Sequence, residues 1–142
     1  MTSDRPLSDA DYRALAGFRH ALRRFQSFSA AAARDAGITP SQHQLLLAIR
    51  GHPGPGDPSM GDVADVLLLR LHSAGELVGR AEANGLLARR PDPDDARRVL
   101  LRLTPDGEHV LDALSRAHRD ELGRFRREAA ALLDELDGPT PT

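Results

Sequence analysis

The segment between residues 86 and 104 constrains the fold most, because it carries a hairpin signal in a chain whose other apolar residues follow helical spacing. Two short runs, Leu86 to Arg90 and Arg98 to Leu103, flank the connection Pro91 to Ala96. Two prolines and three aspartates in that connection favour a turn. The second run alternates as a strand does, with Leu100 and Arg102 on the face opposite its apolar residues. We therefore expect a β-hairpin with a polar tip.

The residues from Asp62 to Gly85 predict two short helices joined by a tight turn. The apolar face of the first helix ends at Leu67, while Leu68 and Leu69 fall off that face. Gly85 follows the second helix as a left-handed stop. The residues expected to pack inward are Val63, Ala64, Leu67, Leu77, Val78 and Ala81.

Residues 8–36 and 105–137 predict long amphipathic helices near the two ends of the chain. Ser8 and Asp11 resemble a helix-capping pair, and Thr104 with Pro105 is a helix start. Gly123 either divides the second helix or weakens it. The apolar stripes are Tyr12, Leu15, Phe18, Leu22, Phe25 and Phe28, then Val110, Leu111, Leu114, His118, Leu122, Phe125, Ala129, Leu132, Leu133 and Leu136. A small middle lobe cannot cover such long stripes, so we expect both to pack against a second copy of the chain.

A short helix and a loop occupy residues 37 to 58. Gly37 provides a stop, and Thr39-Pro40-Ser41-Gln42 is a capping box with proline at the first helical position. The helix is expected to run through Arg50 and to bury Leu45, Leu46 and Ile49. Three glycines and three prolines between Gly51 and Pro58 predict a mobile loop.

The order of these elements predicts a mainly α fold with a small β-hairpin wing, namely a winged helix-turn-helix with long terminal dimerisation helices. The chain, residues 1–142, is expected to form one domain. Within it, residues 39–104 form the DNA-binding lobe, and residues 8–36 and 105–137 form the dimer interface. The pattern alone thus points to a dimer that reads double-stranded DNA.

Composition excludes several other functions. The chain has no cysteine, which excludes disulfides, zinc-cysteine sites and thiol nucleophiles. Its six histidines lack metal-ligand spacing, and no catalytic triad or phosphate-binding glycine loop is evident, so we expect no enzyme, no metal site and no cofactor. The longest apolar run is Val66 to Leu69, and the N-terminus lacks a signal pattern, so the expectation is a cytoplasmic protein without membrane association.

Charge is distributed unevenly along the chain. The formal net charge is −2, and all 19 basic residues are arginine. Residues 70–102 contain seven arginines against five acids, whereas residues 106–137 contain five arginines against nine acids. The near-neutral total therefore does not exclude a nucleic-acid partner, because the arginines gather in the lobe expected to meet DNA.

The segment Asp95-Ala96-Arg97-Arg98-Val99-Leu100-Leu101-Arg102-Leu103-Thr104 resembles the wing signature of the MarR family of bacterial transcriptional regulators. Asn84 to Arg90 resembles the end of the family's recognition helix and the basic strand that follows, and Thr104 to Gly107 resembles the entry into its fifth helix. The similarity in element order extends from about residue 8 to residue 137. The wing motif is its specific part.

The resemblance implies a set of DNA contacts. Arg97 at the wing tip would enter the minor groove, with Asp95 holding the tip in shape. The implied DNA-binding residues are Arg70, Leu71, His72, Ser73, Arg80, Asp95, Arg97 and Arg98, of which the first four face base edges and Arg80 reaches phosphate. The alternatives are a solvated turn pair at Asp95 and Arg97 and a plain surface histidine at His72.

Three residues depart from the family pattern in this region. Arg70 stands where a Ser or Thr cap is usual, and Leu68 stands where glycine is frequent. Glu76 replaces a basic or small polar residue. A carboxylate there can accept a hydrogen bond from a cytosine amino group, but it is unfavourable near phosphates.

The resulting expectation is a homodimeric repressor of a palindromic operator that is released by a small aromatic or anionic ligand. The family resemblance suggests His20, Arg24 and His43 as residues that could line the ligand cleft. Without cysteine, the thiol-oxidation switch of some family members is unavailable. The alternatives are a constitutive DNA binder without ligand, and a protein-interaction module that kept the fold and lost DNA binding.

Overall fold

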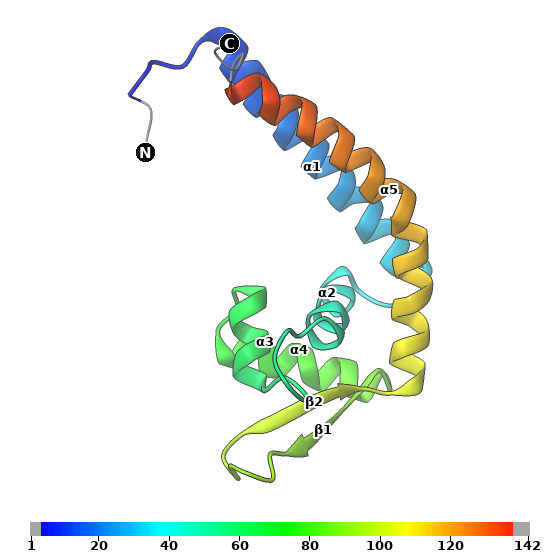
Figure 1. Ribbon diagram of the computed structural model, residues 1–142. Coiled ribbons are helices and arrows are strands. Elements are labelled where there is room, and N and C mark those ends of the chain that lie inside the picture. Colours follow the sequence, from blue (N-terminus) through cyan, green and yellow to red (C-terminus); the bar gives the residue numbers. More distant parts are fainter. Residues whose placement is uncertain (1–3, 138–142) are drawn as a thin grey trace. The chain divides into compact units, whose positions relative to one another are not determined.

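The computed structural model describes residues 4–137, in which helices predominate and one two-stranded hairpin is present (Figure 1). The elements are α1 (Asp9–Asp35), α2 (Pro40–Arg50), α3 (Met60–Leu67), α4 (Leu71–Ala83), β1 (Leu87–Pro91), β2 (Val99–Leu103) and α5 (Pro105–Asp137). This order confirms the expected winged helix-turn-helix with long terminal helices.

The described chain divides into two compact units. The helical unit contains residues 4–30 and 117–137, which are the first part of α1 and the second part of α5. The winged unit contains residues 31–116, which include α2, α3, α4 and both strands.

Two helices begin at the capping residues that the sequence predicts. The amide of Ser8 donates to the Asp11 carboxylate at 2.9 Å, and the amide of Asp11 donates to the Ser8 hydroxyl at 3.1 Å. Thr39 and Gln42 exchange the equivalent two hydrogen bonds at the start of α2. Each pair satisfies two amides that a helix start otherwise leaves without a partner. Gly37, at φ +83°, ends the preceding helix in the left-handed conformation, as expected.

The start of α3 differs from the sequence prediction. The helix begins at Met60, two residues earlier than expected, because Ser59 and Asp62 form a third capping box. The Ser59 amide lies 2.9 Å from the Asp62 carboxylate, and the Asp62 amide lies 3.1 Å from the Ser59 hydroxyl. An aspartate three residues after the cap thus takes the role usually given to Glu or Gln.

In the helical unit, α1 and α5 lie side by side and run in opposite directions (Figure 1). Their contact is aromatic: the ring centre of Phe125 lies 6.2 Å from that of Phe18 and 5.4 Å from that of Phe25. His118 is buried edge-on against Phe25 and Phe28. The apolar stripes of α1 and α5 therefore pack partly against each other within one chain, whereas the sequence analysis placed both stripes against a second copy.

The helical unit leaves apolar side chains in contact with solvent. Leu15 is 40% exposed on α1, and Leu122 and Leu133 are 49% and 47% exposed on α5. Two helices bury only the stripe between them, so the remaining apolar residues have no cover within this unit. The helix α5 is continuous through Gly123, which decides between the two alternatives left open by the sequence.

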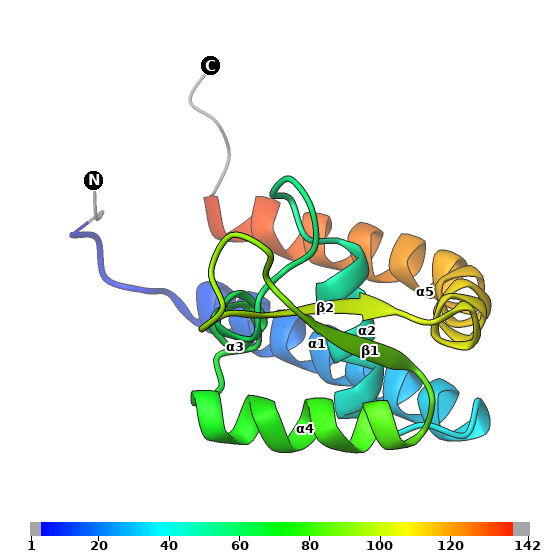
Figure 2. The same ribbon diagram turned by 90° about the horizontal axis from the view of Figure 1, so that it is seen from below.

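The core of the winged unit lies between α2, α3, α4 and the hairpin. Its largest fully buried side chains are Leu45, Leu46, Val63, Val78 and Leu101. The two strands pair antiparallel, with Leu87 opposite Leu103 and Pro91 opposite Val99. Figure 2 shows the two strands of the hairpin together with α4. The core positions predicted for the two helices and the second strand are thus confirmed.

Leu100 corrects the predicted alternation of the second strand. The sequence placed it with Arg102 on the exposed face, but Leu100 is buried, at 8% exposure. Ser59 forms an isolated antiparallel bridge with Leu100, and the amide of Leu101 donates to the carbonyl oxygen of Pro58 at 2.9 Å. The segment before α3 therefore covers this part of β2, and both Leu100 and Leu101 are buried.

Candidate DNA-binding surface

The turn between α3 and α4 depends on one residue in the left-handed conformation. Leu68 adopts φ 56° and ψ 38°, so that its amide donates to Asp65 and the amide of Leu69 donates to Ala64. Glycine normally occupies such a position, because a Cβ atom there is strained. Leu68 is also 91% exposed, so packing of its own side chain does not offset this strain. The turn brings the chain directly into α4.

Helix α4 has one buried face and one exposed face. Ala74, Val78 and Ala81 are fully buried and fix the inner face. The exposed residues predicted to contact DNA from this segment are Arg70, Leu71, His72, Ser73 and Arg80. The structure therefore presents all five to solvent on one helix and the residue before it.

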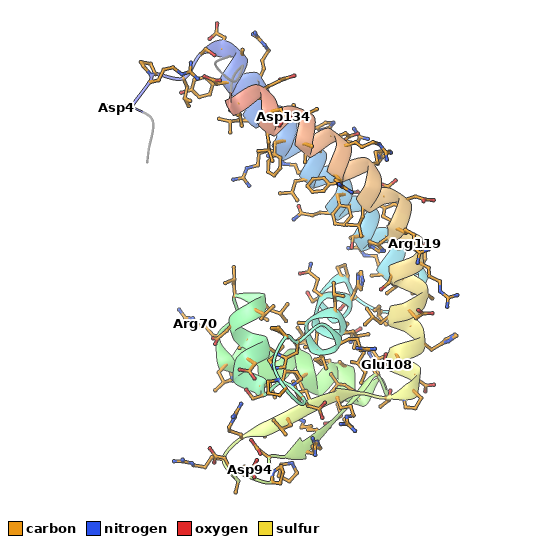
Figure 3. All side chains as sticks on the ribbon, viewed as in Figure 1. Asp4, Arg70, Asp94, Glu108, Arg119 and Asp134 are labelled. Atoms are coloured by element: carbon orange, nitrogen blue, oxygen red, sulfur yellow. The ribbon has the colours of Figure 1, made fainter. Side chains whose placement is uncertain are left out.

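Arg70 is the N-cap of α4 but makes no side-chain capping hydrogen bond. Its side chain points away from the body of the winged unit (Figure 3). The first amides of α4 thus lack a side-chain cap, and an uncapped helix start attracts phosphate oxygens.

His72 and Glu76 are in polar contact on the exposed face of α4. His72 Nε2 lies 3.2 Å from Glu76 Oε1, and the two side chains are 87% and 57% exposed. Sequence reasoning treated the two residues separately, although their spacing of four residues places them on one helix face and signals this pair.

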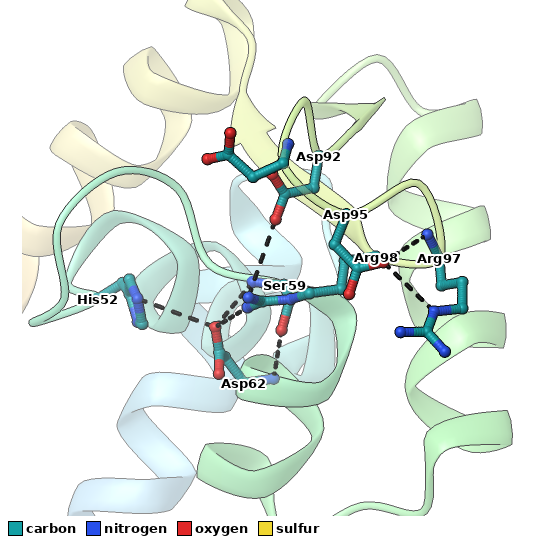
Figure 4. A network of polar contacts seen from close by, with 8 residues as sticks. His52, Ser59, Asp62, Asp92, Asp95, Arg97 and Arg98 are labelled. Atoms are coloured by element: carbon teal, nitrogen blue, oxygen red, sulfur yellow. Dashed lines mark hydrogen bonds and ion pairs between the residues drawn. The ribbon is translucent and has the colours of Figure 1, made fainter.

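The wing tip holds Arg97 in the solvent. Asp95 Oδ1 accepts hydrogen bonds from the backbone amide of Arg97 at 3.0 Å and from its Nε at 3.4 Å (Figure 4). The Arg97 side chain is nevertheless 93% exposed. The aspartate therefore orders the backbone of the tip, while most of the guanidinium stays available.

The neighbouring Arg98 faces the opposite way. Its guanidinium lies 3.7 Å from the Asp62 carboxylate and 3.8 Å from that of Asp92 (Figure 4). His52 approaches the same Asp62 oxygen at 4.0 Å. Arg98 thus connects the wing to the start of α3, so the two adjacent arginines that the sequence analysis grouped together have different surroundings.

The pKa of Asp62 is lowered from its usual value. The main cause is the backbone amide of Ser59, which donates to the carboxylate, and the Ser59 hydroxyl, His52 and Arg98 act in the same direction. Partial burial opposes them. Asp62 is therefore held as a carboxylate, which keeps both the helix cap and the contact with Arg98.

Asp57 provides a second link to the hairpin. It accepts hydrogen bonds from Arg90 on β1 at 3.1 Å and from Arg102 on β2 at 3.1 Å. Its side chain is only 16% exposed. Sequence reasoning missed this residue, because 33 and 45 residues separate it from its partners and the glycine- and proline-rich loop around it carries no local signal.

A polar groove of about 330 Å³ lies beside this link in the winged unit. It is lined by Ile49, Arg50, His52, Gly56, Asp57, Pro58, Arg102, Leu103 and Glu108. Arg50 pairs with Glu108 at 3.2 Å, and Arg102 pairs with Asp57. These charged side chains pair with one another inside the protein. The charge that lines the groove therefore does not indicate a bound ligand.

The residues suggested for a ligand cleft lie in different units. His20 is exposed on α1, and Arg24 pairs with Glu128 of α5 at 3.2 Å, both in the helical unit. His43 is buried in α2 of the winged unit.

Within residues 4–137, no group of three or more His, Asp or Glu side chains is placed to hold a metal ion. Over the same residues, no helix is both long enough and apolar enough to cross a membrane.

A helix-turn-helix followed by a hairpin with an exposed arginine at its tip defines a winged-helix DNA-binding protein. Comparison with known proteins narrows this class. A family model described as the MarR family matches residues 36–98. The transcriptional repressor NicR of Pseudomonas putida is 30% identical over 116 residues, covering 79% of this chain and 72% of NicR. The chain therefore belongs to the MarR family of transcriptional regulators, and it is not an enzyme.

Further comparisons extend this result. The transcriptional activatory protein BadR of Rhodopseudomonas palustris is 33% identical over 79 residues, which are 56% of this chain but only 45% of BadR. A mutant of Escherichia coli MarR, solved with operator DNA, superposes with a TM-score of 0.68 at 21% identity and covers 87% of this chain and 90% of that one. Bordetella bronchiseptica BpsR gives 0.64 at 25% identity, with 86% and 91% covered. The structural matches support the same fold.

Proposed function

We propose that this protein is a homodimeric repressor that binds a palindromic operator and leaves it when a small ligand binds. The observation that carries the proposal is the wing tip, where Asp95 orders the backbone and leaves Arg97 93% exposed. A planar cation presented in this way suits the minor groove, whose narrow form concentrates negative potential.

The proposed contacts divide between the two grooves. Arg97 enters the minor groove, supported by Asp95, and Arg98 adds positive charge while it holds the wing. The exposed start of α4 faces the major groove, where side chains reach base edges. The residues proposed for the major-groove side are Arg70, Leu71, His72 and Ser73 at the bases and Arg80 at phosphate.

The dimer is proposed from the uncovered apolar residues of the helical unit. Leu15, Leu122 and Leu133 remain between 40% and 49% exposed there, and a second copy is the partner that would bury them. A two-fold dimer presents two α4 helices and two wings, which suits a palindromic site. In this organisation residues 1–142 form one domain, with residues 8–36 and 105–137 as dimerisation helices and residues 39–104 as the DNA-binding lobe.

The names of related proteins support the repressor role and the ligand. NicR is called a repressor, and the BpsR structure concerns regulation of its DNA binding by 6-hydroxynicotinic acid. We propose a ligand of the same general kind, a small aromatic or anionic molecule that favours a conformation unable to bind the operator. A regulator of this type acts on chromosomal DNA in the cytoplasm.

The test is a selection of duplexes from genomic fragments by the purified protein, followed by affinity measurements on the enriched site. We expect a palindrome to be enriched and Arg97→Ala to weaken its binding about tenfold or more, because one minor-groove contact is lost in each subunit. Arg5→Ala is the matched control. Arg5 lies outside both the proposed dimerisation helices and the proposed DNA-binding lobe, its side chain is 59% exposed and pairs with Asp11 at 3.1 Å, and its replacement removes the same charge.

Equal affinity of wild type and Arg97→Ala at moderate salt would contradict a role for the wing. Failure to enrich any duplex would favour the protein-interaction alternative. Sedimentation that gives a monomer at micromolar concentration would contradict the proposed dimer.

A further inference from the structure

The exposed face of α4 carries one acidic side chain among the residues proposed to approach DNA. Glu76 lies four residues after His72 and four before Arg80, so the three side chains follow one line along the helix. The buried residues Ala74 and Val78 fix the opposite direction as inward. Glu76 therefore stands in the middle of the surface that faces the major groove.

The neighbours of Glu76 make its carboxylate the most prominent group in the second turn of α4. Gly75 precedes it, and Gly79 lies one turn further on the same side. A Cβ atom added at Gly75 would meet nothing within 4 Å, so the space beside Glu76 is open. No other long side chain of this turn screens the carboxylate from an approaching base pair.

The electrostatic cost of this carboxylate near phosphates is reduced locally. His72 Nε2 lies 3.2 Å from Oε1, and this contact orients the carboxylate. Arg80 adds a positive group one turn away. The second carboxylate oxygen, Oε2, is then free to accept a hydrogen bond from a base.

The major groove offers few hydrogen-bond donors to Oε2 of Glu76. Guanine N7 and O6 and thymine O4 are themselves acceptors and repel a carboxylate. The adenine amino group lies between two acceptors, its own N7 and the O4 of the paired thymine, whereas the cytosine N4 amino group has an acceptor, the guanine O6, on one side only. A carboxylate at this position therefore selects cytosine.

We propose that Glu76 determines operator specificity by accepting a hydrogen bond from the N4 amino group of one cytosine in each half-site. His72 is a positioning residue for the Glu76 carboxylate. The inference depends on the proposed function, because it assumes that α4 enters the major groove.

The experiment is a selection from a random duplex library, performed in parallel with wild type, Glu76→Ala and Glu76→Gln. Wild type should enrich cytosine at one position of each half-site, and replacing that C·G pair should weaken its binding about 5- to 150-fold. Glu76→Ala should lose the preference at that position alone. Glu76→Gln should shift it to adenine, since Gln pairs with adenine N6 and N7.

Glu82→Gln is the matched control on the same helix. Glu82 pairs with Arg89 of β1 at 3.1 Å, and the same charge is removed without altering the first two turns of α4. The Glu82→Gln variant should show the same base preference as wild type at every position of the operator. An unchanged cytosine preference in Glu76→Ala would overturn the assignment while leaving the proposed function intact. A wild-type protein that enriches no duplex would overturn both.

Discussion

Gly107 allows the start of α5 to pack directly against the chain that leads into β1. The Thr104 amide donates to the carbonyl oxygen of Leu86 at 3.1 Å, and the Thr104 hydroxyl donates to that of Gly85 at 2.6 Å. The amide of Gly107 in turn donates to the Thr104 hydroxyl at 3.1 Å. A Cβ atom added at Gly107 would overlap the Leu86 carbonyl oxygen and lie 2.9 Å from its carbon. Both are backbone atoms, so no side-chain rotation relieves the clash.

We expect Gly107→Ala to lower the free energy of unfolding by about 1 to 3 kcal/mol. Overpacking against backbone costs up to about 3 kcal/mol, and displacement of Leu86 weakens its hydrogen bond with Thr104 by about 1 kcal/mol. The better helix propensity of alanine returns about 1 kcal/mol.

Gly123→Ala in the same helix is the control. A Cβ atom there meets only the flexible end of Arg127 at 3.5 Å, so the substitution should raise stability by about 0.5 to 1 kcal/mol. Urea unfolding at one fixed protein concentration measures both variants. A Gly107→Ala protein within about 0.5 kcal/mol of wild type would refute the packing described for the start of α5.

Two further predictions concern the turn before α4 and the start of α3. Leu68→Gly removes the strain of a left-handed leucine and should stabilise the protein by about 1 kcal/mol in the same unfolding assay; a destabilised variant would show that the leucine is not strained. The pKa of Asp62 is lowered in the folded state, so its stabilising effect is present at neutral pH and is lost as the pH falls below the usual value of about 3.9. Asp62→Asn keeps the capping oxygen and should reduce the loss of thermal stability between pH 7 and pH 3; an equal loss in both proteins would contradict this role.

Features set by residues close in sequence were predictable. The capping box of Thr39 and Gln42 needs only a spacing of three residues, and a hairpin needs only turn-forming residues in a row between its strands, although β1 extends through Pro91 and the connection runs from Asp92 to Arg98. Such signals act within one turn of chain, so the sequence reports them directly.

Features that join distant segments were not predictable. Asp57 contacts Arg90 and Arg102 only because the fold brings its loop to the hairpin. Leu100 is buried because Ser59 pairs with it, which strand alternation alone does not encode. The local spacing of residues predicts each helix or strand by itself. Ion pairs between elements, and the burial of one element by another, depend on the tertiary fold.

In the candidate DNA-binding surface, too, the features set by nearby residues were predictable and those that join distant segments were not. Sequence resemblance identified the exposed start of α4 and the tip residues Asp95 and Arg97, of which the structure exposes Arg97 to solvent and leaves Asp95 partly buried. It did not separate Arg97 from Arg98, because the difference lies in the position of Asp62, more than thirty residues earlier in the chain. Their different surroundings leave Arg97 exposed at the tip, whereas Arg98 attaches the wing to the start of α3.

The salt dependence of binding to the enriched operator tests whether two α4 helices and two wings contact DNA together. If the dimer neutralises about six or more phosphates, log K should fall linearly with log salt concentration with a slope of about −5 or steeper. Arg97→Ala should make that slope shallower by about 2, one unit for each wing. A slope near zero would show that the dimer does not neutralise DNA phosphates, and a slope that Arg97→Ala leaves unchanged would show that the wings do not contact DNA.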